Sequence, residues 1–186
     1  MYRLCLLAVG LASLAGCAQP LAVANVTDIK SSTGSRGVDV YEPKRRSGAA
    51  VPEFAGDQLV EVRTYKQIDG EGEVEFPGAH CSLSAADFAA SMQSPAKVRV
   101  PLYRGQSSTL AVTCEMAGFQ KRMVTVAPYD ATRSSRLSSA GGGGLIGVLV
   151  VATVDAMADN SKNEWRYPLA RVVLEPLPKE KRAARQ

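Results

Sequence analysis

The sequence predicts a mainly β domain, a small antiparallel β-sandwich or partly open barrel, and three observations point to this fold class. Apolar and polar residues alternate with a period of two in several short segments after residue 58, as in strands that bury one face. Turn-forming stretches such as RGQSS and MAGF separate these segments. Two cysteines, Cys81 and Cys114, lie among them. Short strands broken by frequent turns favour two packed antiparallel sheets.

Five segments carry the alternation. They are LVEVRTY (59–65), KVRVPLYR (97–104), TLAVTCEMAGF (109–119), KRMVTVAPY (121–129) and LARVVLEP (169–176). In 97–104 the pattern places Val98 and Val100 on the core face and Tyr103 on the opposite face. A sixth segment, AADFAASMQ (85–93), fits either a helical turn or a strand.

The amino end predicts a targeting signal over residues 1–16, because Arg3 precedes a short apolar run. Leu14-Ala15-Gly16-Cys17 resembles a bacterial lipobox. The resemblance implies cleavage before Cys17 and acylation of that cysteine, and Ala18 in the next position favours the outer membrane. The alternative is an ordinary secretory signal. We therefore expect a lipid anchor in the outer membrane and a domain that faces the periplasm.

Residues 17–57 predict an acylated N-terminus and a flexible, disordered tether. They are rich in Ser, Gly and Pro and show little periodicity, apart from a short extended piece at VDVYEP. Such a chain averages roughly 35 Å from end to end. At the other end, the net positive residues 178–186 predict a basic disordered tail.

The cysteine count predicts one disulfide. Cys5 leaves with the signal and Cys17 carries lipid, so Cys81 and Cys114 remain to pair in an oxidising periplasm. Closing a loop of about 34 residues stabilises a domain by roughly 3–4 kcal/mol in the chain-entropy model. The alternative, a metal or redox pair assisted by His80, has a thin ligand set.

The glycine-rich segment 140–158 predicts a short glycine-started apolar helix that belongs to the β domain. Its 15 uncharged residues, 140–154, are fewer than the ~20 that a membrane span needs. Gly143 and Gly147 stand in GxxxG spacing, and Ala152 and Ala156 extend the small-residue face. These four residues are candidates for an interface in self-association or membrane insertion. The glycines also fit a dinucleotide fingerprint, but no credible strand precedes them, so we expect no nucleotide.

The inventory of chemically active residues is sparse. His80 is the only histidine, so we expect no catalytic residue, no metal and no cofactor, with an envelope hydrolase that uses His80 as the alternative. Trp165 and Tyr167 are candidates for ligand stacking, with a place in the core as the other interpretation. A formal net charge of +4 does not indicate nucleic-acid binding.

Residues 94–126 resemble a PEGA-type repeat through Ser94-Pro95, the strand residues 110–112 and Gly118-Phe119. More broadly, residues 74–175 are similar to small uncharacterised proteobacterial lipoproteins, through GGGGLIG, Asp155 and Tyr167-Pro168. The resemblance implies a PEGA-like β domain over 58–177 that binds envelope proteins or glycans.

Together these observations predict a lipid-anchored cell-envelope protein with a non-catalytic binding or assembly role. Its expected partners are the membrane, through the acyl chains, and an envelope protein or glycan, and a homo-oligomer stays open. The alternatives are the hydrolase and a self-associating membrane-active protein built on the glycine-rich segment.

Overall fold

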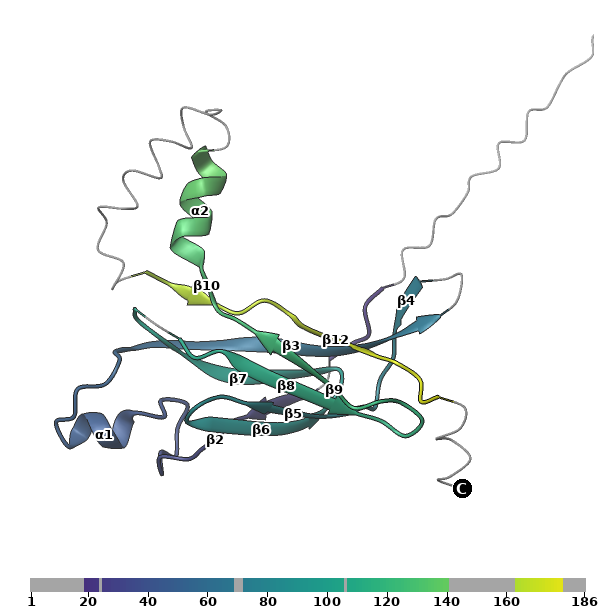
Figure 1. The fold of residues 1–186 in the computed structure, drawn as a ribbon. Helices are drawn as coiled ribbons and strands as arrows, with labels where there is room; N and C mark the ends of the chain where they lie inside the picture. Colours follow the sequence, from purple (N-terminus) through teal and green to yellow (C-terminus); the bar gives the residue numbers. More distant parts are fainter. Residues whose placement is uncertain (1–18, 24, 69–71, 106, 141–162, 179–186) are drawn as a thin grey trace, which may run out of the picture.

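The computed structural model of the 186-residue chain describes residues 19–23, 25–68, 72–105, 107–140 and 163–178. Within them the protein is mainly β, as the alternating segments predicted. Two five-stranded sheets enclose one core and do not close into a barrel. The elements are arranged as in Figure 1.

The first sheet is organised around one long strand. Its order is β1 (Val26–Asp28), β7 (Ala96–Tyr103), β3 (Phe54–Ile68) and β12 (Ala170–Leu174), and β4 (Gly72–Glu75) pairs with the end of β3. Residues 54–62 of β3 pair with β7, and residues 65–68 pair with β4. The pairings β1–β7 and β12–β3 are parallel, so this sheet is mixed rather than purely antiparallel.

The second sheet is antiparallel throughout. Its order is β2 (Lys30–Ser31), β6 (Phe88–Gln93), β5 (His80–Ser84), β8 (Leu110–Glu115) and β9 (Arg122–Val126). The ambiguous segment 85–93 is strand β6, in which Phe88 and Met92 face the core because burial alternates with period two.

The core lies between the inward faces of the two sheets. Val62, Val98 and Val100 from the first sheet meet Leu83, Leu110 and Val112 from the second, and all six are completely buried. Fully burying such side chains is worth about 1.5–3 kcal/mol each. This is the pairing of faces that the alternating segments predicted.

Cys81 and Cys114 face each other directly across β5 and β8. Their sulfur atoms form a disulfide, and both residues are buried on the core face. The disulfide expected from the cysteine count is therefore present, and it joins neighbouring strands of one sheet.

The predicted tether is wrong for most of its length. Residues 25–50 contain β1, β2 and the helix α1 (Glu42–Arg46), and β3 begins at Phe54. Val40 lies in the core with 1% of its surface exposed. The piece VDVYEP, expected to be extended, is a turn that leads into α1, where Pro43 occupies the first helical turn.

The covering of β7 by this N-terminal segment also corrects the placement of Tyr103. Its side chain is buried rather than on a polar face. The ring lies 5.0 Å from that of Tyr41 and 6.0 Å from that of Phe54, between centroids. Its hydroxyl accepts a hydrogen bond from the Val40 N–H and donates one to Asp39. Burial of the ring therefore comes with partners for its polar end.

The elements β10 (Tyr129–Asp130), α2 (Ala131–Ala140) and β11 (Trp165–Arg166), which come between β9 and β12, lie outside the two large sheets (Figure 1). The short strands β10 and β11 pair with each other, and helix α2 rises from β10. Asp130 accepts a hydrogen bond from the Arg133 N–H at the start of α2 and another from the Asn163 amide. The predicted glycine-started helix of 140–158 falls, except for Ala140, outside the described residues.

Candidate functional site

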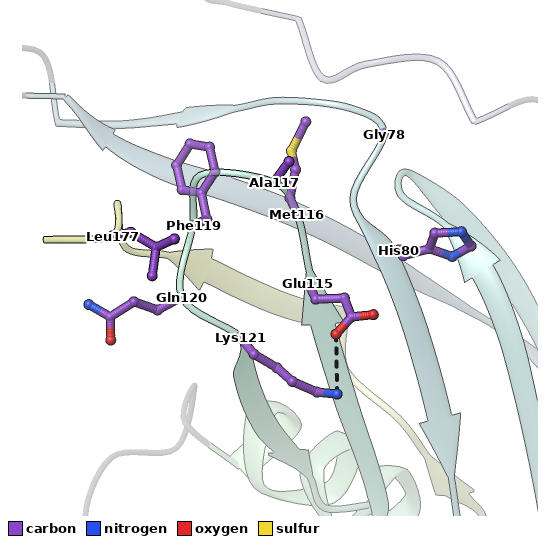
Figure 2. A pocket seen from close by; sticks show the side chains of 9 residues that line it. All are labelled: Gly78, His80, Glu115, Met116, Ala117, Phe119, Gln120, Lys121 and Leu177. Carbon is purple, nitrogen blue, oxygen red and sulfur yellow. Dashed lines mark ion pairs between the residues drawn. The ribbon is translucent and has the colours of Figure 1, made fainter. Parts of the chain in front are cut away.

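A groove of about 840 Å³ opens at one end of the sandwich. We call this the β4 end, defined by β4, the end of β3 and the turn between β8 and β9. The groove is drawn in Figure 2. Residues from three parts of the chain line it, and those used below are His80, Glu115, Met116, Phe119, Lys121 and Leu177.

Backbone hydrogen bonds hold two of these three parts together. Gln120 N–H donates to the Glu175 carbonyl at 2.8 Å, and Leu177 N–H donates to the Gly118 carbonyl at 2.9 Å. The β8–β9 turn is thereby joined to the chain that leaves β12. Loops tied down in this way on both sides present side chains in a fixed arrangement.

The turn at the bottom of the groove depends on one glycine. Phe119 N–H donates to the Met116 carbonyl across the turn, and Gly118 has φ +83°. Turns that need a positive φ at this position favour glycine, because a side chain in that conformation is strained. A Cβ at Gly118 would meet nothing within 4 Å, so the requirement is one of backbone conformation alone.

The floor of the groove is apolar and rests on aromatic stacking. Phe119 stacks on Phe76 with ring centroids 5.3 Å apart, and Phe76 is buried at the edge of the core. The ammonium of Lys66, in β3, lies 5.9 Å from the centroid of the Phe76 ring. Met116 and Leu177 are half-buried beside Phe119. These side chains offer apolar contact area to a bound molecule.

The rim of the groove is charged. The Lys121 ammonium lies 3.2 Å from a carboxylate oxygen of Glu115, with 65% and 60% of the two side chains exposed. His80 stands opposite Glu115 in the β5–β8 register and is exposed. Because exposed ion pairs contribute about 0–1 kcal/mol, Lys121 and Glu115 can separate and pair with charges on a ligand. The arrangement of an apolar floor and a polar rim suits non-covalent recognition.

A second hollow of about 220 Å³ continues from the rim over the outer face of the second sheet. Beyond His80 this face carries small uncharged side chains in register across the strands, namely Ser91, Ser82 and Thr113 in one row and Ala89, Ser84 and Ala111 in the next. Charged groups of the hollow are confined to its groove side, at Glu115 and Lys121.

A buried ion cluster, which we call the Arg63 clamp, lies on the outer face of the first sheet near the β4 end. Arg63 donates to Glu61 at 2.8 Å and to Glu75 at 2.6 Å. Its side chain is 9% exposed and that of Glu75 is 12% exposed. Both backbone groups of Leu21 join the cluster, since its N–H donates to Glu75 and its carbonyl accepts from Arg63, each at 3.0 Å.

The electrostatics of the clamp favour its charged form. Burial alone would lower the pKa of Arg63, but hydrogen bonds to Glu61 and Glu75 outweigh it and the pKa is raised. The hydrogen bond from Arg63 lowers the pKa of Glu61 against the opposing effect of burial, and Lys97 adds to the lowering. Sequence analysis did not find this cluster, although one carboxylate beside an arginine on the same strand face, with a second carboxylate on the next strand, is a readable pattern.

The remaining predicted site residues are placed as follows. Tyr167 is buried and its hydroxyl donates to the Ser108 carbonyl at 2.6 Å, and burial raises its pKa to about 12. It therefore belongs to the core and offers no stacking face. Trp165 is half-buried in β11, and its Nε1 is buried without a hydrogen-bond partner in the structure. Cys17, Gly143, Gly147, Ala152 and Ala156 lie outside the described residues.

Two further findings concern the described residues. They contain no group of three or more His, Cys, Asp or Glu arranged to hold a metal ion. Within the same ranges, none of the helices has the length and apolar character to cross a membrane.

Comparison of the chain with protein-family models, curated proteins and solved structures gave no match.

Proposed function

We propose that the protein is a lipid-anchored component of the bacterial cell envelope that acts by binding, and that the groove at the β4 end holds its partner. The observation that carries the proposal is the groove itself, whose apolar floor of Phe119, Met116 and Leu177 lies inside a rim of opposite charges. Binding sites commonly combine these two features.

The lipobox-like residues 14–17 support the cellular location of the proposal. Acylation of Cys17 would hold the domain at the outer membrane, facing the periplasm, where the Cys81–Cys114 disulfide is stable. The partner we propose is another envelope protein. The apolar floor and charged rim of the groove fit a polypeptide segment, because protein interfaces combine an apolar core with a polar rim. Phe119 is half-buried and stacked on Phe76, so it offers no open aromatic face to a glycan.

Photo-crosslinking in cells tests this proposal. A photoreactive phenylalanine analogue replaces the exposed Gln120 at the groove, and a matched control replaces the exposed Ala49 beyond α1. We expect one recurring envelope protein to be crosslinked from position 120 and not from position 49. If the same proteins were crosslinked from both positions, or if no protein were crosslinked from position 120, binding through the groove would be contradicted.

A hydrolase is the second candidate function, and one observation favours it. The smaller hollow brings His80 together with the hydroxyls of Ser82 and Ser91 and with the carboxylate of Glu115. Replacement of His80 by Ala separates the two functions. Unchanged crosslinking and an unchanged cellular phenotype in a normally folded His80→Ala protein would support binding, whereas loss of the phenotype with crosslinking retained would support the hydrolase.

A further inference from the structure

The path of the chain between the proposed acylation site and the domain is much shorter than the sequence suggested. A tether over residues 17–57 would let the domain move roughly 35 Å away from the membrane. Instead, the Arg63 clamp holds Leu21 at both its backbone groups. Residues 26–28 are then paired with β7 in the first sheet as β1.

The clamp is built to hold this point firmly. Arg63 and Glu75 are both largely buried and joined at 2.6 Å, and each also bonds Leu21. Hydrogen bonds to charged groups are shorter and stronger than those between neutral groups. The cluster also satisfies both polar backbone groups of a residue that belongs to no strand.

Chain length then limits the distance from the membrane. Cys17 is four residues from Leu21, which an extended chain spans in at most about 14 Å. Glu75 of the clamp is three residues from Gly78 of the groove, a span of at most about 11 Å. The clamp and the groove therefore share the β4 end, and Figure 1 shows β4 at the opposite end of the sandwich from α1.

We infer that the β4 end is docked directly on the membrane surface, so that the domain stands on the bilayer and is not suspended from it. The inference rests on the proposed acylation of Cys17. Its partner surface is the lipid headgroup layer of the leaflet that holds the acyl chains. A protein partner in the groove would then be met at the bilayer surface.

The side chains of the β4 end fit such a surface. Leu21 and Val74 are large hydrophobic residues with 36% and 38% of their surface exposed. Lys66 at the end of β3 and Lys121 at the groove add cations with long aliphatic stems. Apolar side chains among lysines are typical of segments that lie in the membrane interface, because the stems reach the apolar layer while the ammonium groups stay in water.

Energy transfer from the protein to the bilayer tests the inference. The acylated full chain, carrying a fluorescent amino acid at the exposed position Gln67 of β3 or at the exposed position Ala49, is reconstituted in vesicles with an acceptor dye on the lipid headgroups. We expect strong transfer from position 67 and weak transfer from position 49, because β3 alone spans about 46 Å between its ends. Equal transfer from the two positions, or stronger transfer from position 49, would overturn the inference.

Two variants make the test specific. Insertion of a twelve-residue Gly-Ser segment between Gln19 and Pro20 leaves the clamp intact and should abolish most of the transfer from position 67, since such a segment adds roughly 19 Å. Glu75→Gln should produce a similar loss by weakening the hold on Leu21. Glu73→Gln is the matched control, because Glu73 lies on the same strand but pairs with Arg171. Energy transfer from position 67 in this variant should equal that in the chain without the substitution. Transfer that is insensitive to the insertion would also overturn the inference.

The experiment distinguishes failure of the proposed membrane anchoring from failure of the proposed docked orientation. A chain that is recovered without lipid and does not associate with vesicles would refute the anchoring itself. A chain that is acylated and vesicle-bound but shows equal transfer from positions 67 and 49 would refute only the docked orientation.

Discussion

Replacement of Val40 by Ala tests whether the N-terminal segment is part of the folded domain. Val40 is 1% exposed and packs in the core beside Tyr103, although it lies in the stretch that reads as a tether. The change removes two buried methyl groups at about 0.8 kcal/mol each, and the cavity left behind adds to this, so we expect a loss of about 2 kcal/mol in the free energy of unfolding.

Urea unfolding followed by circular dichroism measures the effect. The matched control is Val26→Ala in β1, because Val26 belongs to the same segment but is 51% exposed. We expect the control to change the free energy of unfolding by less than about 0.5 kcal/mol. If Val40→Ala and Val26→Ala gave the same small change, the packing of residues 25–50 against the sandwich would be wrong.

Three further predictions concern the disulfide, the groove turn and the tyrosines. Reduction of the bond between Cys81 and Cys114, which closes a separation of 33 residues, should lower the free energy of unfolding by about 3–4 kcal/mol in urea titrations with and without reductant; no change would contradict a structural role. Gly118→Ala should cost about 1–2 kcal/mol in the same assay, because φ is +83° there and only backbone strain is added, and a neutral result would exclude that strain. The hydrogen bond to Asp87 raises the pKa of Tyr41 to about 12, and burial raises that of Tyr167 to about 12, so the stability that these two give is present below pH 10 and is lost as the pH rises toward 12. Near-ultraviolet titration should show them ionising later in the folded than in the urea-unfolded chain, and coincident curves would refute this.

The strands could be predicted from the sequence because their signal is local. Residues 59–65, 97–104, 109–119, 121–129 and 169–176 alternate with period two, and each overlaps a strand of the sandwich. The disulfide followed from counting cysteines. The parallel pairings could not be predicted in the same way, since nothing in the residues 26–28 or 170–174 specifies the direction of the strand that they pair with.

The sequence does not reveal that residues 25–50 are ordered, because the contacts that stabilise them are with residues far away in the sequence. Val40 bonds Tyr103, 63 residues away, and the Tyr41 hydroxyl donates to Asp87, 46 residues away. Leu21 is held through Glu75, 54 residues away. A stretch rich in Ser and Gly shows no periodicity even when the rest of the domain fixes it in place.

The candidate site was predicted only in fragments. His80 was singled out because it is the sole histidine, and Gly118-Phe119 because of the PEGA-type resemblance. Leu177 lay at the limit of the predicted domain, yet it completes the groove because the chain after β12 bonds the β8–β9 turn. The sequence is compatible with Tyr167 either in a stacking surface or in the core, and its burial in the structure places it in the core.

Mass spectrometry of the chain extracted from bacterial membranes tests the central claim most directly. We predict a mature chain whose first residue is Cys17 and whose mass includes the covalently attached acyl groups, and we predict that Cys17→Ala removes the acyl mass and releases the domain from the membrane fraction. A mature chain that begins at another residue and carries no lipid would contradict the account of an anchored domain held at the bilayer by the Arg63 clamp.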